Sequence, residues 1–585
     1  MFRATIARAS ATVLPRAASW SCKTQFTKNK ALFASAALVA GGVAWSFYSH
    51  DMVSLHSDEV RVAGVDDLKD GEMRKVKLND DTDILLVKTG GKFFATSPKC
   101  PHYGAPLEKG LLAGDRVVCP WHDASFALDS GEVQGGPSLD GLLSYPVTIR
   151  DNAVFVSPSP LPPRSPTPSG ADKTVLIVGG GPASLVAAET LRREGFSGKI
   201  VVATKDSEAT FVDRPMLSKA VGIPLAKIIL RSDDAIKASN ISVVKDEVTA
   251  IDVEARTATT RGAQTLSFDH VVIAPGSRAV QLPGGSLTGV HTLRSPADST
   301  AIANAVKDPG SKVVVIGASF IGMEAASSIK KNLKAEDVTI VGMEATPMQA
   351  VLGEVGSVLG GLQEKNGVKL RMGSRVTAFR SEGGKVTGVE LSDGTVLPAD
   401  VVVLGVGVKP NTSTIKFNGV TTRDDGSLEV DEFLRVRGAK PGVAFAAGDV
   451  AAFPYHGSNI RVEHWNAAQD MGRVVGHNIA QPQSQQRFTS VPFFWTMMWG
   501  KSLKYVGATP NGYDEILPVN DTDGSLASAF YVKNGRVEAV ATFDGVKAAA
   551  AGELLAWGEM PPPCIVAKES FDLVEYAKSR AAMRV

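Results

Sequence analysis

Two short segments pair a cysteine with a histidine and could together hold a metal centre. The first is Cys100-Pro-His102 and the second is Cys119-Pro-Trp-His122. Zinc accepts the same four ligands and is the competing interpretation, although a zinc finger groups its two cysteines and its two histidines separately. A 2Fe–2S cluster with two Cys on one iron and two His on the other needs mixed segments of this kind.

The sequence around these four residues resembles the Rieske family. The match includes CPHYGAPLEKG and CPWHDASFALDSGEV, with Gly104, Leu107, Phe126 and Gly131 at family positions. Neither segment holds an additional cysteine, so the resemblance is to ferredoxin-type Rieske domains, which lack a disulfide between the loops. The resemblance implies a Rieske 2Fe–2S cluster. Histidine ligation raises its potential above that of all-cysteine ferredoxins, so it should accept electrons from a reduced flavin.

The remaining histidines argue against a second, oxygen-activating iron. Such an iron is held by two histidines and a carboxylate. None of the other histidines forms a closely spaced pair beside an acid, and they are His50, His56, His270, His291, His456, His464 and His477. We therefore expect the protein to move electrons rather than to hydroxylate a substrate.

A buried strand runs into a glycine turn and a helix over Thr174–Ser184. Gly179 allows the tight turn, and Gly181 lets backbone N–H groups at the helix start approach a pyrophosphate. Ser184 replaces the third glycine of the dinucleotide fingerprint with another small residue. The segment predicts a dinucleotide-binding fold.

A second copy of this pattern covers Lys312–Gly322. Gly317 and Gly322 keep the outer fingerprint positions, and Ser319 replaces the middle glycine. Glu344 follows the next strand, where an acid can bind a ribose 2′-hydroxyl and repel a 2′-phosphate. We expect this copy to bind NADH rather than NADPH, with Gly407 in a later turn of the same site.

Further motifs resemble those of the glutathione-reductase-like flavoproteins and the ferredoxin reductases. Phe268–Gly276 is similar to their Ala-Thr-Gly turn, Gly405–Asn411 to their second turn, Gly442–Asp449 to the segment whose Asp contacts FAD, and Arg214–Lys219 to Arg-Pro-x-Leu-Ser-Lys. The residues that this resemblance assigns to FAD are Gly179, Gly181, Arg214, Lys219, Ala274, Gly276, Arg278, Gly448 and Asp449. Those assigned to the flavin–nicotinamide environment are Glu463, His464, Trp465 and Trp495.

Cysteine usage excludes two classes of chemistry. Four cysteines in 585 residues rule out a disulfide scaffold. Cys564 is the one cysteine beyond Cys119, so the flavin domains cannot carry the dithiol pair of a disulfide reductase. We expect no protein nucleophile.

The charges divide unevenly along the chain. Residues 1–50 hold six Lys or Arg and no acid, which leaves 56 basic against 61 acidic side chains in the body. A slightly acidic body argues against nucleic acid as a partner. The basic, Ser- and Ala-rich start is typical of a mitochondrial transit peptide, and residues 31–49 carry no charge over a length that could span a bilayer.

The sequence thus predicts a multidomain chain. An all-β Rieske domain is followed by α/β domains with two dinucleotide-binding folds, of the glutathione-reductase-like kind, and by an α+β C-terminal domain. In chain order the predicted parts are a mitochondrial transit peptide (1–30), a candidate transmembrane anchor (31–49), the Rieske domain (58–157), a Pro/Ser linker (158–171), the first part of an FAD-binding domain (172–300), an NAD-binding domain (301–430), the second part of the FAD-binding domain (431–490) and a C-terminal reductase domain (491–585).

This layout resembles the Rieske-containing members of the apoptosis-inducing-factor-like mitochondrial oxidoreductases. The resemblance implies electron flow from NADH through FAD to the fused cluster and on to an unknown one-electron acceptor. It also implies a mitochondrial location, with the inner membrane as the candidate site. The alternative is an NADH-sensing signalling protein with slow, incidental turnover. A third hypothesis retains the enzymatic activity but reverses the direction of electron flow. Electrons would then pass from a donor through the cluster to the flavin and on to NAD⁺.

Overall fold

The computed structural model describes residues 59–206 and 208–581. The predicted transit peptide and the predicted membrane anchor lie outside the described residues. Within the part of the chain that is described, no helix combines the length and the apolar character needed to cross a bilayer.

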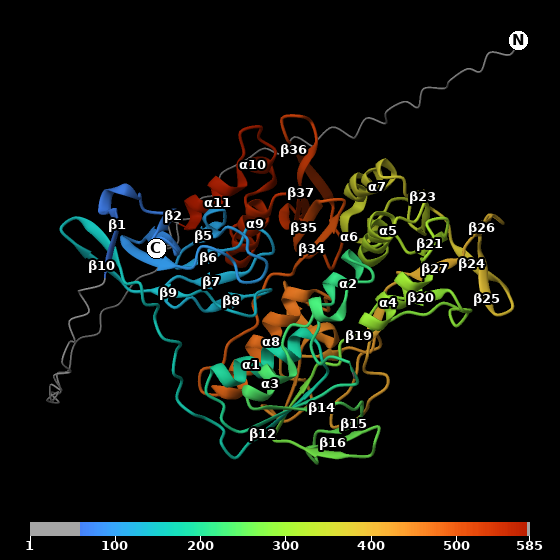
Figure 1. The fold of residues 1–585 in the computed structure, drawn as a ribbon, viewed down its shortest axis with the longest axis horizontal. Helices are drawn as coiled ribbons and strands as arrows, with labels where there is room; N and C mark the ends of the chain where they lie inside the picture. Colours follow the sequence, from blue (N-terminus) through green and yellow to red (C-terminus); the bar gives the residue numbers. More distant parts are fainter. Residues whose placement is uncertain (1–58, 207, 582–585) are drawn as a thin grey trace, which may run out of the picture.

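The first domain consists of three small antiparallel sheets (Figure 1). Their strands are β1 (Val60–Gly64), β2 (Glu72–Lys77), β3 (Asp83–Thr89), β4 (Lys92–Thr96), β5 (Leu111–Ala113), β6 (Arg116–Val118), β7 (Ser125–Ala127), β8 (Val133–Gly135), β9 (Ser144–Tyr145), β10 (Val147–Arg150) and β11 (Ala153–Val156). Strand β3 reads as a continuous apolar run because both its faces are covered. Leu85 and Val87 pack toward the cysteine loops, while Ile84 and Leu86 pack toward the outer sheets.

The second domain is built on a parallel sheet in the order β14-β13-β12-β18-β31. Its strands are β12 (Thr174–Val178), β13 (Lys199–Ala203), β14 (Ile241–Val244), β18 (His270–Ile273) and β31 (Ala444–Ala446). Helices α1 (Pro182–Arg193) and α8 (Trp465–Ala480) pack closely together beside this sheet (Figure 1). A Cβ on Gly472 of α8 would lie 2.3 Å from the Ala183 carbonyl oxygen of α1, so this close packing requires a glycine. The last strand comes from far along the chain, and the third domain is therefore inserted within the second.

Smaller elements complete this domain. They are α2 (Pro215–Lys219), α3 (Asp233–Ala238), β15 (Val248–Asp252), β16 (Thr257–Thr260), β17 (Thr265–Ser267), β19 (Ser277–Ala279), β28 (Val408–Pro410), β29 (Lys416–Asn418), β30 (Leu428–Glu429), β32 (Ala451–Tyr455) and β33 (Ser458–Ile460). Helix α2 carries the Arg-Pro-x-Leu-Ser-Lys motif and packs against α5 (Phe320–Asn332) of the inserted domain.

The inserted domain repeats the parallel arrangement in the order β20-β27-β21-β22-β23. Its strands are β20 (Val290–Thr292), β21 (Lys312–Ile316), β22 (Asp337–Val341), β23 (Lys369–Arg371) and β27 (Val401–Leu404), and the antiparallel β24 (Val376–Glu382), β25 (Lys385–Leu391) and β26 (Val396–Pro398) extend it. Its other helices are α4 (Pro296–Ala305), α6 (Gln349–Leu352) and α7 (Gly356–Lys365). Each glycine turn thus directly follows a strand of a parallel sheet, Gly179 after β12 and Gly317 after β21, as the sequence predicts.

The C-terminal domain is an antiparallel sheet in the order β34-β35-β38-β37-β36, covered by helices. Its elements are β34 (Phe493–Met498), β35 (Lys501–Gly507), β36 (Glu515–Asn520), β37 (Leu526–Lys533), β38 (Arg536–Thr542), α9 (Gly545–Trp557), α10 (Pro563–Val566) and α11 (Leu573–Ala581). Strands β37 and β38 are joined by a tight hairpin at Asn534-Gly535. Both residues have positive φ, 50° and 72°, which matches the twist of the flanking strands.

The first domain packs against the C-terminal domain rather than hanging from its linker (Figure 1). Leu111 and Ala113 of β5 share one apolar core with the alanines of α9. The Pro120 carbonyl oxygen lies so close to Gly545 that a Cβ there would be 1.5 Å away. The same interface continues to α8, where Gly136 N–H donates to Asp470 at 2.8 Å.

Candidate functional site

The loops that carry the Cys/His pairs are held by their own backbone. Cys100 follows β4, and its N–H donates to the Ala105 carbonyl at 2.9 Å while its carbonyl accepts from Gly104 N–H at 2.8 Å. Cys119 directly follows β6, and its N–H donates to the Ala124 carbonyl at 2.7 Å. Both cysteines are only 2% exposed. The sulfur atoms are therefore fixed in position and shielded from solvent.

The four side chains form two like pairs. The Cys119 sulfur contacts the Cys100 thiol, and this contact together with burial raises the pKa of Cys100. The imidazole rings of His102 and His122 lie 5.1 Å apart between centroids. Burial lowers the pKa of His102 to about 4 and that of His122 to about 3, which keeps both rings neutral and able to bind metal.

This pairing fits a dinuclear cluster better than one zinc ion. A zinc ion needs its donors around a single point, and among the described residues no three His, Cys, Asp or Glu side chains gather in that way. A Rieske 2Fe–2S cluster takes both thiolates on one iron and both imidazoles on the other. The separate thiol and imidazole pairs match this division.

The imidazole rings of His102 and His122 pack against Trp495 of β34. Its ring centroid is 4.6 Å from that of His122 and 6.4 Å from that of His102. The Asn466 side-chain amide at the start of α8 donates to the His122 carbonyl at 2.9 Å. Lys219 Nζ lies 5.7 Å from the centre of the Trp495 ring, on the side of a large cavity. The indole therefore stands between the two histidines and this cavity.

The cavity has a volume of about 1050 Å³, which is large enough for a dinucleotide cofactor. Of the residues predicted as cofactor or flavin–nicotinamide contacts, those in its wall are Gly179, Gly181, Arg214, Lys219, Ala274, Gly276, Arg278, Ser319, Gly448, Asp449, Glu463, His464, Trp465 and Trp495. The predicted nicotinamide residues Gly317, Gly322, Glu344 and Gly407 are not part of this wall.

The first glycine turn opens into the cavity. Gly179 has φ 120°, and a Cβ there would lie 2.1 Å from the Ala274 carbonyl oxygen. A Cβ on Gly181 would meet open space, so its backbone is exposed to whatever occupies the cavity. Helix α1 begins at the next residue and directs its first N–H groups the same way. The turn is thus suited to a pyrophosphate.

The second turn meets the cavity at Ser319. Gly317 has φ 107°, and a Cβ on Gly322 would lie 1.9 Å from the Gly317 carbonyl oxygen, so both glycines serve close backbone packing. Ser319 precedes α5 and lines the cavity. Glu344 lies in the loop after β22, where its carbonyl accepts from Gly373 N–H at 2.9 Å.

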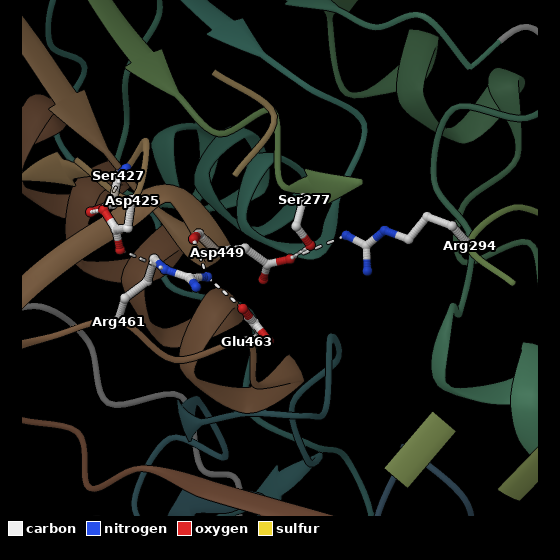
Figure 2. Close-up of polar contacts among 7 residues, drawn as sticks. All are labelled: Ser277, Arg294, Asp425, Ser427, Asp449, Arg461 and Glu463. Carbon is white, nitrogen blue, oxygen red and sulfur yellow. Dashed lines mark hydrogen bonds and ion pairs between the residues drawn. The ribbon is translucent and has the colours of Figure 1, made fainter. Parts of the chain in front are cut away.

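A polar network surrounds Asp449 in the cavity wall (Figure 2). Its carboxylate accepts from Ser277 Oγ at 2.5 Å and from Arg294 Nη2 at 3.1 Å. Arg461 donates to the Asp449 carbonyl at 3.3 Å and to Glu463 at 2.5 Å. Burial raises the pKa of Glu463, although the Arg461 charge opposes this effect.

Three nitrogen atoms in the cavity wall are buried without a hydrogen-bond partner among the described residues. They are Nε of Arg214, Nε of Arg294 and Nδ1 of His464. Unpaired buried polar atoms cost free energy unless a ligand satisfies them. Burial also lowers the pKa of His464 to about 4, which leaves a neutral imidazole beside the cavity. These atoms fit a bound cofactor that offers acceptors and donors.

Sequence reasoning missed Glu324, which is 2% exposed and lines the cavity. Its carboxylate binds Lys219 Nζ at 2.9 Å and accepts from Ser218 Oγ at 2.5 Å and Thr496 Oγ1 at 2.7 Å. The sequence signal that could have identified it is that Glu324 is an isolated acidic residue among the small and apolar residues that follow Gly322. Arg294 was also missed, and no local motif marks it.

Comparisons with known proteins agree with this architecture. Residues 58–146 match the Rieske [2Fe-2S] domain, and residues 173–472 match the pyridine nucleotide-disulphide oxidoreductase family. Apoptosis-inducing factor 3 of Homo sapiens is 37% identical over 506 residues, which cover 83% of this chain and 82% of that protein.

Two solved structures share the reductase fold. The ferredoxin reductase for the CYP199A2 system from Rhodopseudomonas palustris superposes with a TM-score of 0.63 at 29% identity and covers 69% of this chain and 100% of its own. The reductase in the covalent putidaredoxin reductase–putidaredoxin complex gives a TM-score of 0.63 at 27% identity, covering 71% and 100%.

These matches identify the cofactors and the class of reaction. The Rieske domain implies a 2Fe–2S cluster, and the oxidoreductase domain implies FAD and NAD(P)H. The protein is an oxidoreductase that acts on NAD(P)H, with a ferredoxin-reductase-like fold. The chain belongs to the pyridine nucleotide-disulphide oxidoreductase family and carries a Rieske domain at its amino-terminal side.

Proposed function

We propose that this chain takes electrons from NADH at the cavity, passes them through Trp495 to its own Rieske centre, and delivers them singly to a separate acceptor. The observation that carries this proposal is the position of Trp495, which lines the cavity and packs 4.6 Å from the His122 ring. Because the Rieske domain is docked with its histidines toward the indole, the two redox sites are neighbours within one chain.

The cavity lined by Gly179, Gly181 and Ser319 would hold the FAD of this proposal. FAD supplies the exchange between two-electron nicotinamide chemistry and one-electron chemistry. Gly179 and Gly181 would admit its pyrophosphate at the start of α1, and Arg214 would contribute its unpaired Nε. Asp449 is held by Ser277 and Arg294 and faces the cavity, where it would bind a hydroxyl group of the cofactor.

Where the flavin ring is expected, the cavity wall carries a lysine and a glutamate whose charges neutralise each other. Lys219 is paired with buried Glu324, and its ammonium also lies over the Trp495 ring. His464 and Trp465 complete the wall at the start of α8. These residues would orient a bound flavin and exclude water from it.

The nicotinamide would enter along the second turn. Ser319 at the start of α5 lines the cavity, while Gly317, Gly322 and Gly407 shape the turns behind it. Glu344 follows β22 and would bind the ribose hydroxyls, which favours NADH over NADPH.

The location and the acceptor are separate parts of the proposal. The basic, acid-free start of the chain supports import into a mitochondrion. The ferredoxin-reductase relatives support a one-electron acceptor of the ferredoxin or cytochrome class.

A comparison of the full chain with a Cys119→Ser variant tests the relay. We expect the variant to lack the cluster, to keep rapid flavin reduction by NADH in anaerobic stopped flow, and to lose most turnover with cytochrome c or a ferredoxin. Equal acceptor rates in the two proteins would overturn the relay. Flavin reduction far slower than ordinary turnover in the wild type would favour the sensor alternative.

A further inference from the structure

A buried lysine lies beside the histidine side of the Rieske centre. Lys504 stands in β35, directly opposite Trp495 of β34, and is 7% exposed. Its Nζ donates to the carbonyls of Phe543 at 3.2 Å and Ser502 at 3.4 Å. No carboxylate of the described residues forms an ion pair with it. A burial this deep without a close counter-charge is costly for an ammonium group.

The side chain lies on the sheet face that meets the Rieske domain. Residues directly opposite in an antiparallel pair share a face, so Lys504 and Trp495 point the same way. The next pair, Phe494 and Tyr505, stacks at 5.3 Å on the opposite face and lines the cavity. Lys504 itself is not part of the cavity wall. Lys504 therefore lies beside Trp495 without facing the cavity itself.

Lys504 also lies close to the loop that carries His122. Its Nζ is bonded to the Phe543 carbonyl, and Gly545, two positions further along, packs against the Pro120 carbonyl in that loop. Lys219, the other lysine beside Trp495, differs because it is neutralised by Glu324 at 2.9 Å. The nearest acid that acts on Lys504 is Asp544, whose carboxylate is engaged by the N–H groups of Val546 and Lys547 at the start of α9. Lys504 thus remains a poorly compensated cation.

Reduction adds one negative charge to an iron–sulfur cluster and consumes no proton in the iron or sulfide itself. A fixed cation in a low-dielectric interface stabilises that added charge. We propose that Lys504 is a tuning residue, which raises the reduction potential of the Rieske cluster when its domain is docked and so favours electron transfer from the flavin. This inference rests on the proposed relay, and it implies that the cluster becomes a stronger reductant when it leaves the interface.

The test is a redox titration of the full chain loaded with FAD and cluster. Mediator dyes and dithionite set the potential, while electron paramagnetic resonance follows the cluster and visible absorbance follows the flavin. The variants are Lys504→Met, which removes the charge, and Lys504→Arg, which keeps it. Lys501→Met is the matched control, because Lys501 is an exposed lysine of the same strand.

One full charge at a distance of roughly 10 Å through the protein interior changes the equilibrium constant for cluster reduction by about tenfold. Tenfold corresponds to about 59 mV for a one-electron couple. We expect Lys504→Met to lower the cluster potential by about this amount and the flavin potential by much less, while the Arg variant and Lys501→Met stay near wild type.

A cluster potential in Lys504→Met equal to that of the wild type would overturn the proposal, and so would an equal fall in Lys501→Met. If the Met variant does not fold, Lys504→Gln keeps a donor for the two carbonyls and gives the same measurement. The dyes bypass NADH, so this result is independent of the relay. Failure of the relay would instead show as a cluster that NADH leaves oxidised.

Discussion

An ion pair joins the Rieske domain to the C-terminal domain, and we expect its loss to weaken docking. Arg116 Nη2 of β6 lies 2.6 Å from Glu553 Oε2 of α9, and the Glu553 side chain is only 8% exposed. Burial raises the pKa of Glu553, and the Arg116 charge opposes that rise. Arg116→Ala would leave a buried carboxylate without its partner.

The size of the effect follows from the exposure of the two partners. Truncating one member of a buried, hydrogen-bonded charge pair costs roughly 2–5 kcal/mol. Arg116 is 31% exposed, so water screens part of the interaction and the lower end, about 2 kcal/mol, applies. That weakens docking by roughly 30-fold. We expect slower turnover of a one-electron acceptor and unchanged reduction of the flavin by NADH.

The assay pairs stopped-flow flavin reduction with cytochrome c turnover. Limited proteolysis of the linker at residues 158–171 is added to detect undocking. Glu553→Gln combined with Arg116→Ala should lose less than Arg116→Ala alone, because no charge is then buried. Arg61→Ala is the control, since Arg61 is exposed on β1 away from the interface. Acceptor turnover and proteolysis in Arg116→Ala that equal those of the control would refute this reasoning.

Three further predictions concern the cavity. Trp495→Leu should slow cluster reduction while leaving NADH reduction of the flavin intact, and rapid-freeze paramagnetic resonance showing an unchanged rate would contradict the proposed path. Glu324→Gln should destabilise the chain by about 3 kcal/mol in denaturant titration, because it leaves Lys219 charged at 8% exposure, whereas exposed Glu336→Gln should change little. The pKa of His464 falls from 6.5 to about 4 on folding, so the unfolded chain binds a proton that the folded chain does not, and stability should drop by about 3 kcal/mol between pH 6.5 and 4. His464→Asn should remove that part of the pH dependence, and an identical pH profile in the variant would refute the assignment.

Local spacing was enough to predict the chemistry of this chain. The mixed Cys/His segments and the two glycine turns are contiguous patterns, and their physical requirements act within a few residues. Gly179 needs a positive φ, and Cys100 needs a loop that folds back on itself. The Asn534-Gly535 hairpin depends on the same kind of local rule.

Contacts between distant segments were not predictable in this way. Arg116 and Glu553 are 437 positions apart, and neither belongs to a motif. Glu324 looks like an ordinary helix acid until Lys219, Ser218 and Thr496 are brought around it by three different elements. The place of Trp495 depends on how two domains dock, which side-chain periodicity does not encode. The Pro/Ser linker stays a prediction from composition, and no pattern in the sequence indicates that the Rieske and C-terminal domains share an apolar core.

The central claim is that one chain reduces its own iron–sulfur centre with electrons from NADH. The most direct test is an anaerobic paramagnetic resonance spectrum of the full chain, loaded with FAD and iron, before and after addition of NADH. We predict that NADH produces the signal of a reduced Rieske cluster in proportion to the iron present, and that the signal is absent in Cys119→Ser. A flavin that bleaches while the cluster stays oxidised would contradict the account.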